Sequence, residues 1–227
     1  MSFTLTWFGH AAFGLSLGDH KILIDPFISD NPSASVDVND LEADFILISH
    51  GHGDHVGDAL NIAARTDALI ISNYEIATWF EKQGFKVHGQ HIGGGYLHPF
   101  GHLKLTLAFH GSALPDGSDG GNPVGFLLTT DGGERIYFAC DTGLFGDMRL
   151  IGEDSIDLAV LPIGDNFTMG PKDALRAVQF IQPKFVIPVH YNTFELINQD
   201  PDEWAERILA ETDTIPHILK PGESFSL

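Results

Sequence analysis

The segment SHGHGDH, residues 49–55, carries three histidines and one aspartate within six positions. His50, His52, Asp54 and His55 follow the pattern H-x-H-x-D-H, which neither an apolar core nor a solvated loop is expected to contain. Neutral imidazole nitrogens and carboxylate oxygens are the ligands that borderline divalent cations prefer. The motif therefore predicts a metal site, provided that other segments of the chain supply further ligands.

Further metal-competent side chains occur where apolar, strand-like runs end. Five such runs are each followed by a histidine or an aspartate, namely Asp25, His50, His110, Asp141 and His190. Strand ends that share one edge of stacked sheets bring such side chains together and hold them more rigidly than free loops do. This repeated placement strengthens the prediction of a metal site.

The elements that must position these residues are many short strands and few helices. The strand-like runs are residues 4–8, 13–17, 21–25, 45–49, 68–72, 103–109, 125–130, 135–140, 158–161 and 185–189. Helices are predicted between residues 49 and 68, after a capping box at residues 72–75, from Pro171 to before Pro183, and from Asp200 to about residue 210. No linker or repeat is visible, so we expect one domain over residues 1–227, built as two packed sheets with outer helices.

The composition excludes several classes of function. The chain has 12 basic and 31 acidic residues and a formal net charge of −19, so its surface repels nucleic acid and anionic lipid. The single cysteine, Cys140, excludes an intramolecular disulfide and fits a reducing compartment. We find no signal peptide and no apolar run near the ~20 residues of a membrane span. We therefore expect a cytoplasmic protein that acts on a small molecule, with no nucleic-acid or membrane partner.

Together these motifs resemble the metallo-β-lactamase fold superfamily, and more closely its uncharacterised metal-dependent hydrolases related to ascorbate-phosphate lactonases. The resemblance runs from about Trp7 to Pro221. It includes Gly9-His10, Asp25-Pro26, SHGHGDH, His110, Cys140-Asp141-Thr142-Gly143, the segment PIGDNFTMGP at residues 162–171, and Pro188-Val189-His190. It implies a four-layer αββα sandwich, of the α/β class, with a dinuclear metal site at one sheet edge.

The resemblance also implies a set of ligands for two divalent ions. The first ion would be bound by His50, His52 and His110. The second would be bound by Asp54, His55 and His190, and Asp141 would bridge the two. Zinc is the expected metal, with manganese and iron as alternatives, since histidine and aspartate ligands suit all three.

The chemistry that follows is hydrolysis. Two cations about 3.5–4 Å apart would lower the pKa of a shared water and yield a hydroxide that attacks a small ester, lactone or phosphodiester. Asp54 would also act in catalysis, by orienting the hydroxide and taking a proton. Asp25 is expected to accept a hydrogen bond from a ligand imidazole and so fix its tautomer.

Other residues keep two interpretations. His10 is either a structural histidine or a contact of a ligand or of the substrate. Asn192 either donates to a developing oxyanion or caps a turn. Residues 165–168 either cap the following helix or help to hold an anion at its start. Residues 111–123 form either a mobile lid or an ordinary surface hairpin.

Two other functions are alternatives to hydrolysis. Related folds hold a di-iron centre for oxygen chemistry, but those typically carry glutamate where this chain has His52, and they use a flavin domain that is absent here. His52 therefore favours hydrolysis. A non-catalytic metal-binding module is disfavoured because such a module has no need to keep an open coordination position. Cys140 precedes Asp141 on a predicted strand, so its thiol is expected to point to the opposite face and to be buried.

Overall fold

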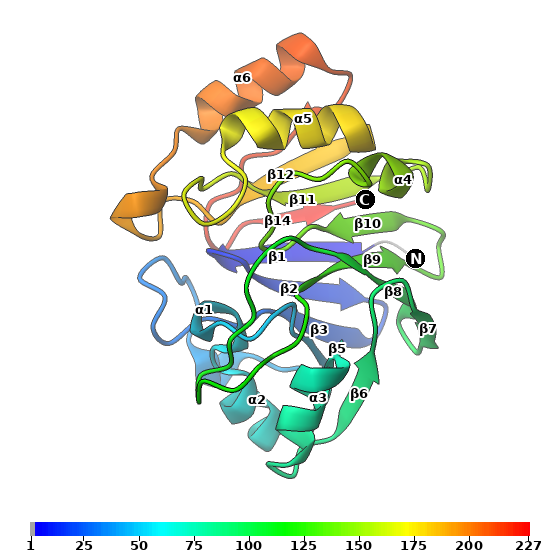
Figure 1. Cartoon of the computed structure of the whole chain (residues 1–227), viewed down its shortest axis with the longest axis vertical. Helices are drawn as coiled ribbons and strands as arrows, with labels where there is room; N and C mark the ends of the chain where they lie inside the picture. Colours follow the sequence, from blue (N-terminus) through cyan, green and yellow to red (C-terminus); the bar gives the residue numbers. More distant parts are fainter. Residues whose placement is uncertain (1–2) are drawn as a thin grey trace.

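Two sheets of seven strands each pack face to face, and helices cover the outer face of each sheet (Figure 1). The computed structural model describes residues 3–227. The chain builds the first sheet with strands up to residue 90 and the second with strands from residue 95 onward, except that the last strand returns to the first sheet. The predicted αββα sandwich is confirmed.

The first sheet has the strand order β14-β1-β2-β3-β4-β5-β6. Its strands are β1 (Phe3–Gly9), β2 (Ala12–Leu17), β3 (His20–Ile24), β4 (Phe45–Leu47), β5 (Leu69–Asn73), β6 (Val87–Gln90) and β14 (Ser224–Ser226). Strands β1 to β3 form an antiparallel meander, whereas β3 to β6 are parallel. Parallel neighbours need crossover connections, and these contain α1 (Gly53–Val56), α2 (Ala59–Thr66) and α3 (Tyr74–Glu81).

The second sheet repeats this plan with the order β13-β12-β11-β10-β9-β8-β7. Its strands are β7 (Gly95–His98), β8 (Gly101–Leu107), β9 (Val124–Thr129), β10 (Arg135–Phe138), β11 (Leu158–Pro162), β12 (Phe185–Val189) and β13 (Ile215–Pro216). Strands β7 to β10 are antiparallel and β10 to β13 are parallel. Helices α4 (Met148–Gly152), α5 (Pro171–Ile181) and α6 (Pro201–Glu211) lie on this half. No helix within residues 3–227 is both long and apolar enough to cross a membrane.

The hydrophobic core is arranged in layers that match this architecture. Alternate residues of β1 and β9, such as Leu5 and Phe126, are fully buried between the two sheets. A second cluster lies between the first sheet and its helices, where Ile70 contributes from β5 and Phe80 from α3. Burying one face of each helix and both faces of each sheet is what makes a four-layer sandwich stable.

Several predicted boundaries are wrong at the ends that face the functional residues. The strands predicted at 45–49, 103–109 and 135–140 end at residues 47, 107 and 138, because the chain there leaves the hydrogen-bonded ladder and bends. Cys140 is consequently not on a strand: it follows β10 in a left-handed conformation, with φ of 53°. The alternation used to orient its side chain therefore does not apply.

The predicted capping box is also wrong. The N-cap of α3 is Asn73, whose side chain accepts a hydrogen bond from the amide of Ile76, while the Ser72 hydroxyl donates to the carbonyl of Ile48. Helix α4 and the strands β13 and β14 were not predicted, since segments of two to five residues carry too little periodicity.

Candidate metal centre

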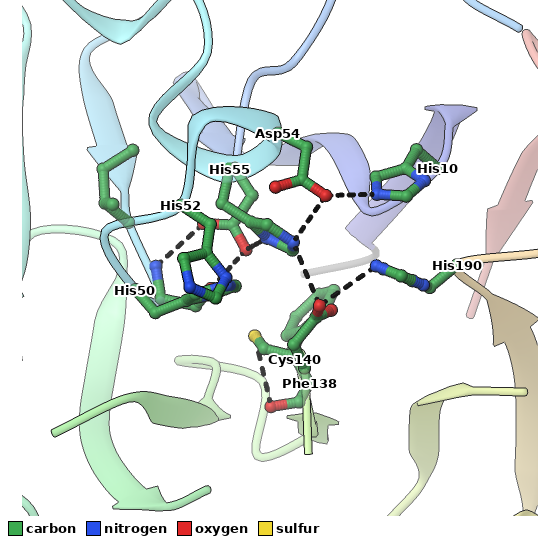
Figure 2. Close-up of polar contacts among 12 residues, drawn as sticks. His10, His50, His52, Asp54, His55, Phe138, Cys140 and His190 are labelled. Carbon is green, nitrogen blue, oxygen red and sulfur yellow. Dashed lines mark hydrogen bonds and ion pairs between the residues drawn. The ribbon is translucent and has the colours of Figure 1, made fainter. Parts of the chain in front are cut away.

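The predicted histidines and aspartates gather at one edge of the sandwich, where parallel strands of both sheets have their carboxyl ends (Figure 2). His10 follows β1 of the first sheet, and His190 follows β12 of the second. The amide of His190 donates to the carbonyl of His10 at 3.0 Å. This backbone hydrogen bond joins the two sheets at the edge that carries the site.

The motif at residues 49–55 is a turn that leads into the short helix α1. His52 is the N-cap, and its carbonyl accepts hydrogen bonds from the amides of His55 and Val56. Gly57 ends the helix with φ of 42°, and a Cβ at this position would lie 2.6 Å from the carbonyl oxygen of Pro26. Only glycine fits there, because the backbone is left-handed and a neighbouring main chain is too close.

One group of ligand atoms comes from three histidines. His50, His52 and His110 each offer a ring nitrogen within 4.8 Å of the others. Nε2 of His50 lies 3.0 Å from Nδ1 of His52, and the ring of His110 is 4.9 Å from that of His50. The structure thus brings together the three residues expected to bind the first ion.

A second group contains His10, Asp54, His55 and His190, again with ligand atoms within 4.8 Å of one another. Asp54 Oδ2 lies 3.1 Å from Nε2 of His10 and 3.9 Å from Nε2 of His55. Three of these residues were expected around the second ion. His10 is an addition to that expected group.

Asp141 lies between the two groups. Its Oδ2 atom is 3.3 Å from Nε2 of His55, 3.0 Å from Nε2 of His190 and 3.5 Å from Nε2 of His110. The side chain is 3% exposed, so its negative charge is shielded from water. A carboxylate that approaches both groups has the position required of a bridging ligand.

Buried polar residues behind the two groups orient the imidazoles. Asp25 Oδ2 lies 2.8 Å from Nδ1 of His55, and the amide and hydroxyl of Ser49 donate to the same carboxylate. Nδ1 of His10 lies 2.9 Å from the hydroxyl oxygen of Thr193. Burial, the largest effect, lowers the pKa of His10 to about 4, so its ring is neutral and carries one N–H. The carboxylate of Asp54 can only accept, so this N–H is on Nε2, and Nδ1 accepts from Thr193.

The backbone is left-handed at several of these positions. His10, Asp25, Cys140 and His190 have φ of 54°, 45°, 53° and 55°. Residues other than glycine adopt this backbone region at a cost of about 1–3 kcal/mol each. The strands are therefore followed by sharp turns that direct the chain, and the side chains on it, into the edge of the sandwich.

The side chains present fit divalent cations. Among residues 3–227, buried atoms without a hydrogen-bond partner include Nε2 of His55, Nε2 of His190 and Oδ1 of Asp141. An unpaired buried polar atom costs about 1–3 kcal/mol, and a bound cation would offset that cost. Imidazole nitrogen with carboxylate oxygen is a donor set that suits zinc, manganese and iron.

The electrostatics of the site favour positive charge. Burial lowers the pKa of His55, but Asp141 and Asp25 outweigh burial and hold that pKa well above its usual range. Burial raises the pKa of Asp141, but His190 and His55 hold it well below its usual range. The carboxylate of Asp141 therefore stays ionised, and the space beside Nε2 of His55 stabilises a cation.

Cys140 does not offer its thiol to this site. Its Sγ atom lies 3.8 Å from the carbonyl oxygen of Phe138 (Figure 2). Burial, reinforced by the charges of Asp25 and Asp141, raises the pKa of the thiol well above its usual range. A protonated thiol is a poor metal ligand.

The remaining candidates make local hydrogen bonds. Asn192 is exposed, has φ of 57°, and accepts a hydrogen bond from the amide of Gln199. Asp165 accepts from the amide of Asn166 within a turn before α5. These contacts are those of turn residues.

The segment 111–123 is a hydrogen-bonded hairpin. Ala113 and Asp119 pair across it, and the side chain of Asn73 donates to the carbonyls of Gly120 and Asn122. The hydroxyl of Ser112 accepts from the amide of Gly51 at 3.0 Å. The hairpin is thus attached both to β5 and to the motif that supplies the ligands.

Sequence reasoning missed two supporting residues. Thr193 hydrogen-bonds His10, and Ser49 links Asp25 to the segment that carries His50. Ser49 stands directly before the metal motif, so its position was a usable signal. Thr193 had none, since its contact with His10 joins residues 183 positions apart.

Comparisons with known proteins identify the family. A model of the beta-lactamase superfamily domain matches residues 4–190. A UPF0173 metal-dependent hydrolase of Pelotomaculum thermopropionicum is 50% identical over 228 residues, covering 98% of this chain and 99% of that protein. One of Thermus thermophilus is 48% identical over 221 residues, covering 97% of each. The solved structure of Igni18, a metallo hydrolase of the archaeon Ignicoccus hospitalis, is 36% identical with a TM-score of 0.92 and covers 100% of this chain and 99% of its own. The chain therefore belongs to the beta-lactamase superfamily and, within it, to the UPF0173 family of metal-dependent hydrolases.

Proposed function

We propose that this hydrolase uses two divalent cations, bound in the candidate metal centre, to cleave a small ester, lactone or phosphodiester. The observation that carries the proposal is the position of Asp141. Its Oδ2 atom lies within 3.5 Å of ring nitrogens of His55, His110 and His190, which belong to both ligand groups.

In this proposal each ion has its own ligands and the two share one carboxylate. The first ion is bound by His50, His52 and His110, and the second by Asp54, His55 and His190, with Asp141 between them. Zinc is the proposed metal, and manganese and iron suit the same donors. When bound, such a pair lowers the pKa of a water toward neutrality and polarises the bond under attack.

Asp54 is the residue proposed to act on the attacking water. Its side chain is 33% exposed, whereas that of Asp141 is 3% exposed, so Asp54 is the carboxylate within reach of solvent and substrate. Burial raises the pKa of Asp54, but the hydrogen bond from His10 and the charge of His55 hold it below its usual range. An ionised carboxylate at this place can orient a water and accept its proton.

His10 and Asp25 are proposed to position the ligands. His10 donates to Oδ2 of Asp54, which leaves the other carboxylate oxygen free to face the reacting water. Asp25 accepts from Nδ1 of His55, which directs Nε2 of that ring to the second ion. Such partners of ligands fix the tautomer and raise the basicity of the ring.

Metal content and hydrolysis together test the proposal. The chain would be purified, stripped with a chelator, reloaded with zinc or manganese, and analysed for bound ions and for cleavage of chromogenic esters, lactones and phosphodiesters. We expect two ions per chain and metal-dependent hydrolysis of at least one class. His102→Ala, which removes an exposed histidine on β8, is the control and should change neither result. A fully loaded chain that binds iron and consumes oxygen instead would support the redox alternative.

A further inference from the structure

The loops around the metal centre contain no lysine or arginine. These loops are residues 25–44, 48–58, 108–123, 139–147, 162–171 and 189–200. Each of them contains at least one aspartate or glutamate. An anionic substrate group that extends beyond the metal ions would therefore meet acidic side chains and no basic one from these loops.

Three basic residues flank the loops. Lys220 is exposed and lines a pocket with Tyr191 and Asn192 of the loop at residues 189–200. Arg149 of α4 packs over the ring of Phe180, with its guanidinium carbon 4.0 Å from the ring centre, and is therefore engaged against α5. Lys172 is exposed in the first turn of α5. Lys172 and Lys220 are thus the flanking cations that a test of substrate charge must include.

The starts of α3 and α6 are capped by their own polar side chains. Asn73 caps α3, and Asp200 caps α6. The free amides of a helix N-terminus attract anions, but in these two helices an amide oxygen or a carboxylate oxygen already accepts from them.

Three phenylalanines, from three different loops, are instead exposed around the centre. Phe109, Phe167 and Phe194 are 57%, 54% and 42% exposed. Large apolar side chains that are exposed beside a functional site are typical of a surface that binds a ligand. Ligand sites are lined mainly by hydrophobic and aromatic side chains.

Hydrogen bonds and ring contacts connect each of these phenylalanines to the site. Phe109 directly precedes His110, and its amide donates to the hydroxyl of Thr142, the neighbour of Asp141. The turn that carries Phe167 is held to Thr142 by the amide of Met169.

The ring of Phe194 contacts a residue of the metal centre directly. The ring centre of Phe194 lies 5.6 Å from that of His10. Three loops therefore present aromatic side chains next to residues of the metal centre.

We propose that the substrate is an uncharged ester or lactone with an apolar group that contacts Phe109, Phe167 and Phe194, and that anionic substrates, phosphodiesters included, are disfavoured. This inference rests on the hydrolytic function proposed above. The apolar group gains free energy by leaving water against the rings. An anionic group has no such gain, and the acidic loops repel it.

A matched pair of substrates tests the proposal on the zinc-loaded full chain. p-Nitrophenyl hexanoate and mono-p-nitrophenyl adipate share a leaving group and an acyl length, and they differ in one terminal carboxylate. We expect kcat/KM to be about tenfold or more higher for the hexanoate at low ionic strength, with a smaller ratio at high salt. Bis(p-nitrophenyl) phosphate should be cleaved more slowly than the hexanoate.

Variants test the contact with the phenylalanines and the repulsion by the acidic loops separately. Phe167→Ala should raise KM for the hexanoate by about fivefold to tenfold, whereas Leu209→Ala, which removes an exposed leucine on α6, should not. Glu195→Lys should reduce the difference in kcat/KM between the hexanoate and the adipate monoester. Asp131→Lys, in the turn at the far end of β10, should leave that difference unchanged, and so should Lys172→Gln and Lys220→Gln.

A binding measurement distinguishes failure of this inference from failure of the proposed hydrolysis. Hexananilide and adipic acid monoanilide keep the same difference in charge but resist hydrolysis, and calorimetry reports their affinity. If no ester is cleaved and hexananilide still binds more tightly, the hydrolytic function is wrong and the ligand class stands. Equal cleavage of the two esters, faster cleavage of the phosphodiester, or equal or absent binding of the anilides would overturn the inference.

Discussion

Nδ1 of His55 lies 2.8 Å from Oδ2 of Asp25, and both side chains are almost completely buried. The carboxylate accepts the N–H on Nδ1, so in the neutral ring that a cation requires the lone pair is on Nε2, the atom that faces Asp141 at 3.3 Å. One hydrogen bond behind the site thus determines which nitrogen of His55 is available to a cation.

Replacing this acceptor should weaken metal binding without removing a ligand. Asp25→Asn loses the charge that stabilises the correct tautomer of His55, and changes of this kind typically cost 10–100-fold in metal affinity, so we expect about that loss for zinc. Competition with a chromophoric chelator measures it. Asp44→Asn removes an exposed carboxylate that accepts from Lys21 at the opposite edge of the sheet, and should leave the affinity unchanged.

Two ligand replacements should differ in how many ions they release. His52 contacts only the first ligand group among the described residues, so His52→Ala should lose one ion per chain. Asp141 approaches both groups, so Asp141→Ala should lose both. Hydrolysis should disappear in each variant. Elemental analysis gives the stoichiometry, and a variant that kept two ions per chain would contradict the assignment of its ligand.

Alanine should have opposite effects on stability at two glycines, the first residue of α1 and its C-cap. Gly57→Ala places a Cβ 2.6 Å from the carbonyl oxygen of Pro26 on a left-handed backbone, and should destabilise the fold by about 1–3 kcal/mol. Gly53 lies in α1 with nothing within 4 Å of an added Cβ, so Gly53→Ala should be neutral or stabilising by up to about 1 kcal/mol. Urea unfolding of both variants checks the contrast, and equal midpoints would refute it.

Stability should fall in mild acid because of His98, away from the metal centre. Its ring is buried with Nε2 3.1 Å from Oε1 of Gln90, and burial, with the charges of His88 and His102, lowers its pKa from 6.5 to about 4. The unfolded chain binds a proton below pH 6.5, whereas the folded chain binds it only near pH 4. The stability contributed by neutral His98 is therefore complete above pH 6.5 and is lost as the pH falls toward 4, by about 1–3 kcal/mol.

The role of His98 can be tested by comparing how the unfolding free energy depends on pH in the variant and in the parent chain. His98→Gln should reduce the change in unfolding free energy between pH 7 and pH 4.5, measured by urea unfolding of the metal-free chain. Comparison with the parent chain removes the contribution of the histidines in the metal centre. An unchanged difference between the two pH values would show that His98 is not responsible.

The architecture and the contiguous part of the site could be predicted from the sequence, because both depend on local patterns. Apolar runs bounded by turn residues indicate buried strands, and residues 49–55 need only one turn to bring their donors together. The bends after the strands could not be predicted. Nothing in the residue types of Cys140 or His190 signals the left-handed backbone that each adopts, so the predicted strands extended past their true ends.

The environment of His10 also lay beyond sequence reasoning. Its contact with Asp54 crosses 44 residues, and its backbone hydrogen bond with His190 joins strands of different sheets. Such contacts depend on how one sheet packs on the other, and residue spacing does not contain that information.

Because His50, Asp54 and His55 follow strands of one sheet and His110, Asp141 and His190 follow strands of the other, a cation bound among them would hold both halves of the chain at once. Ion binding is then thermodynamically linked to the docking of the halves. Chelation should lower the cooperativity with which the two halves melt, and an ion added during refolding should select the docked pair over either half alone.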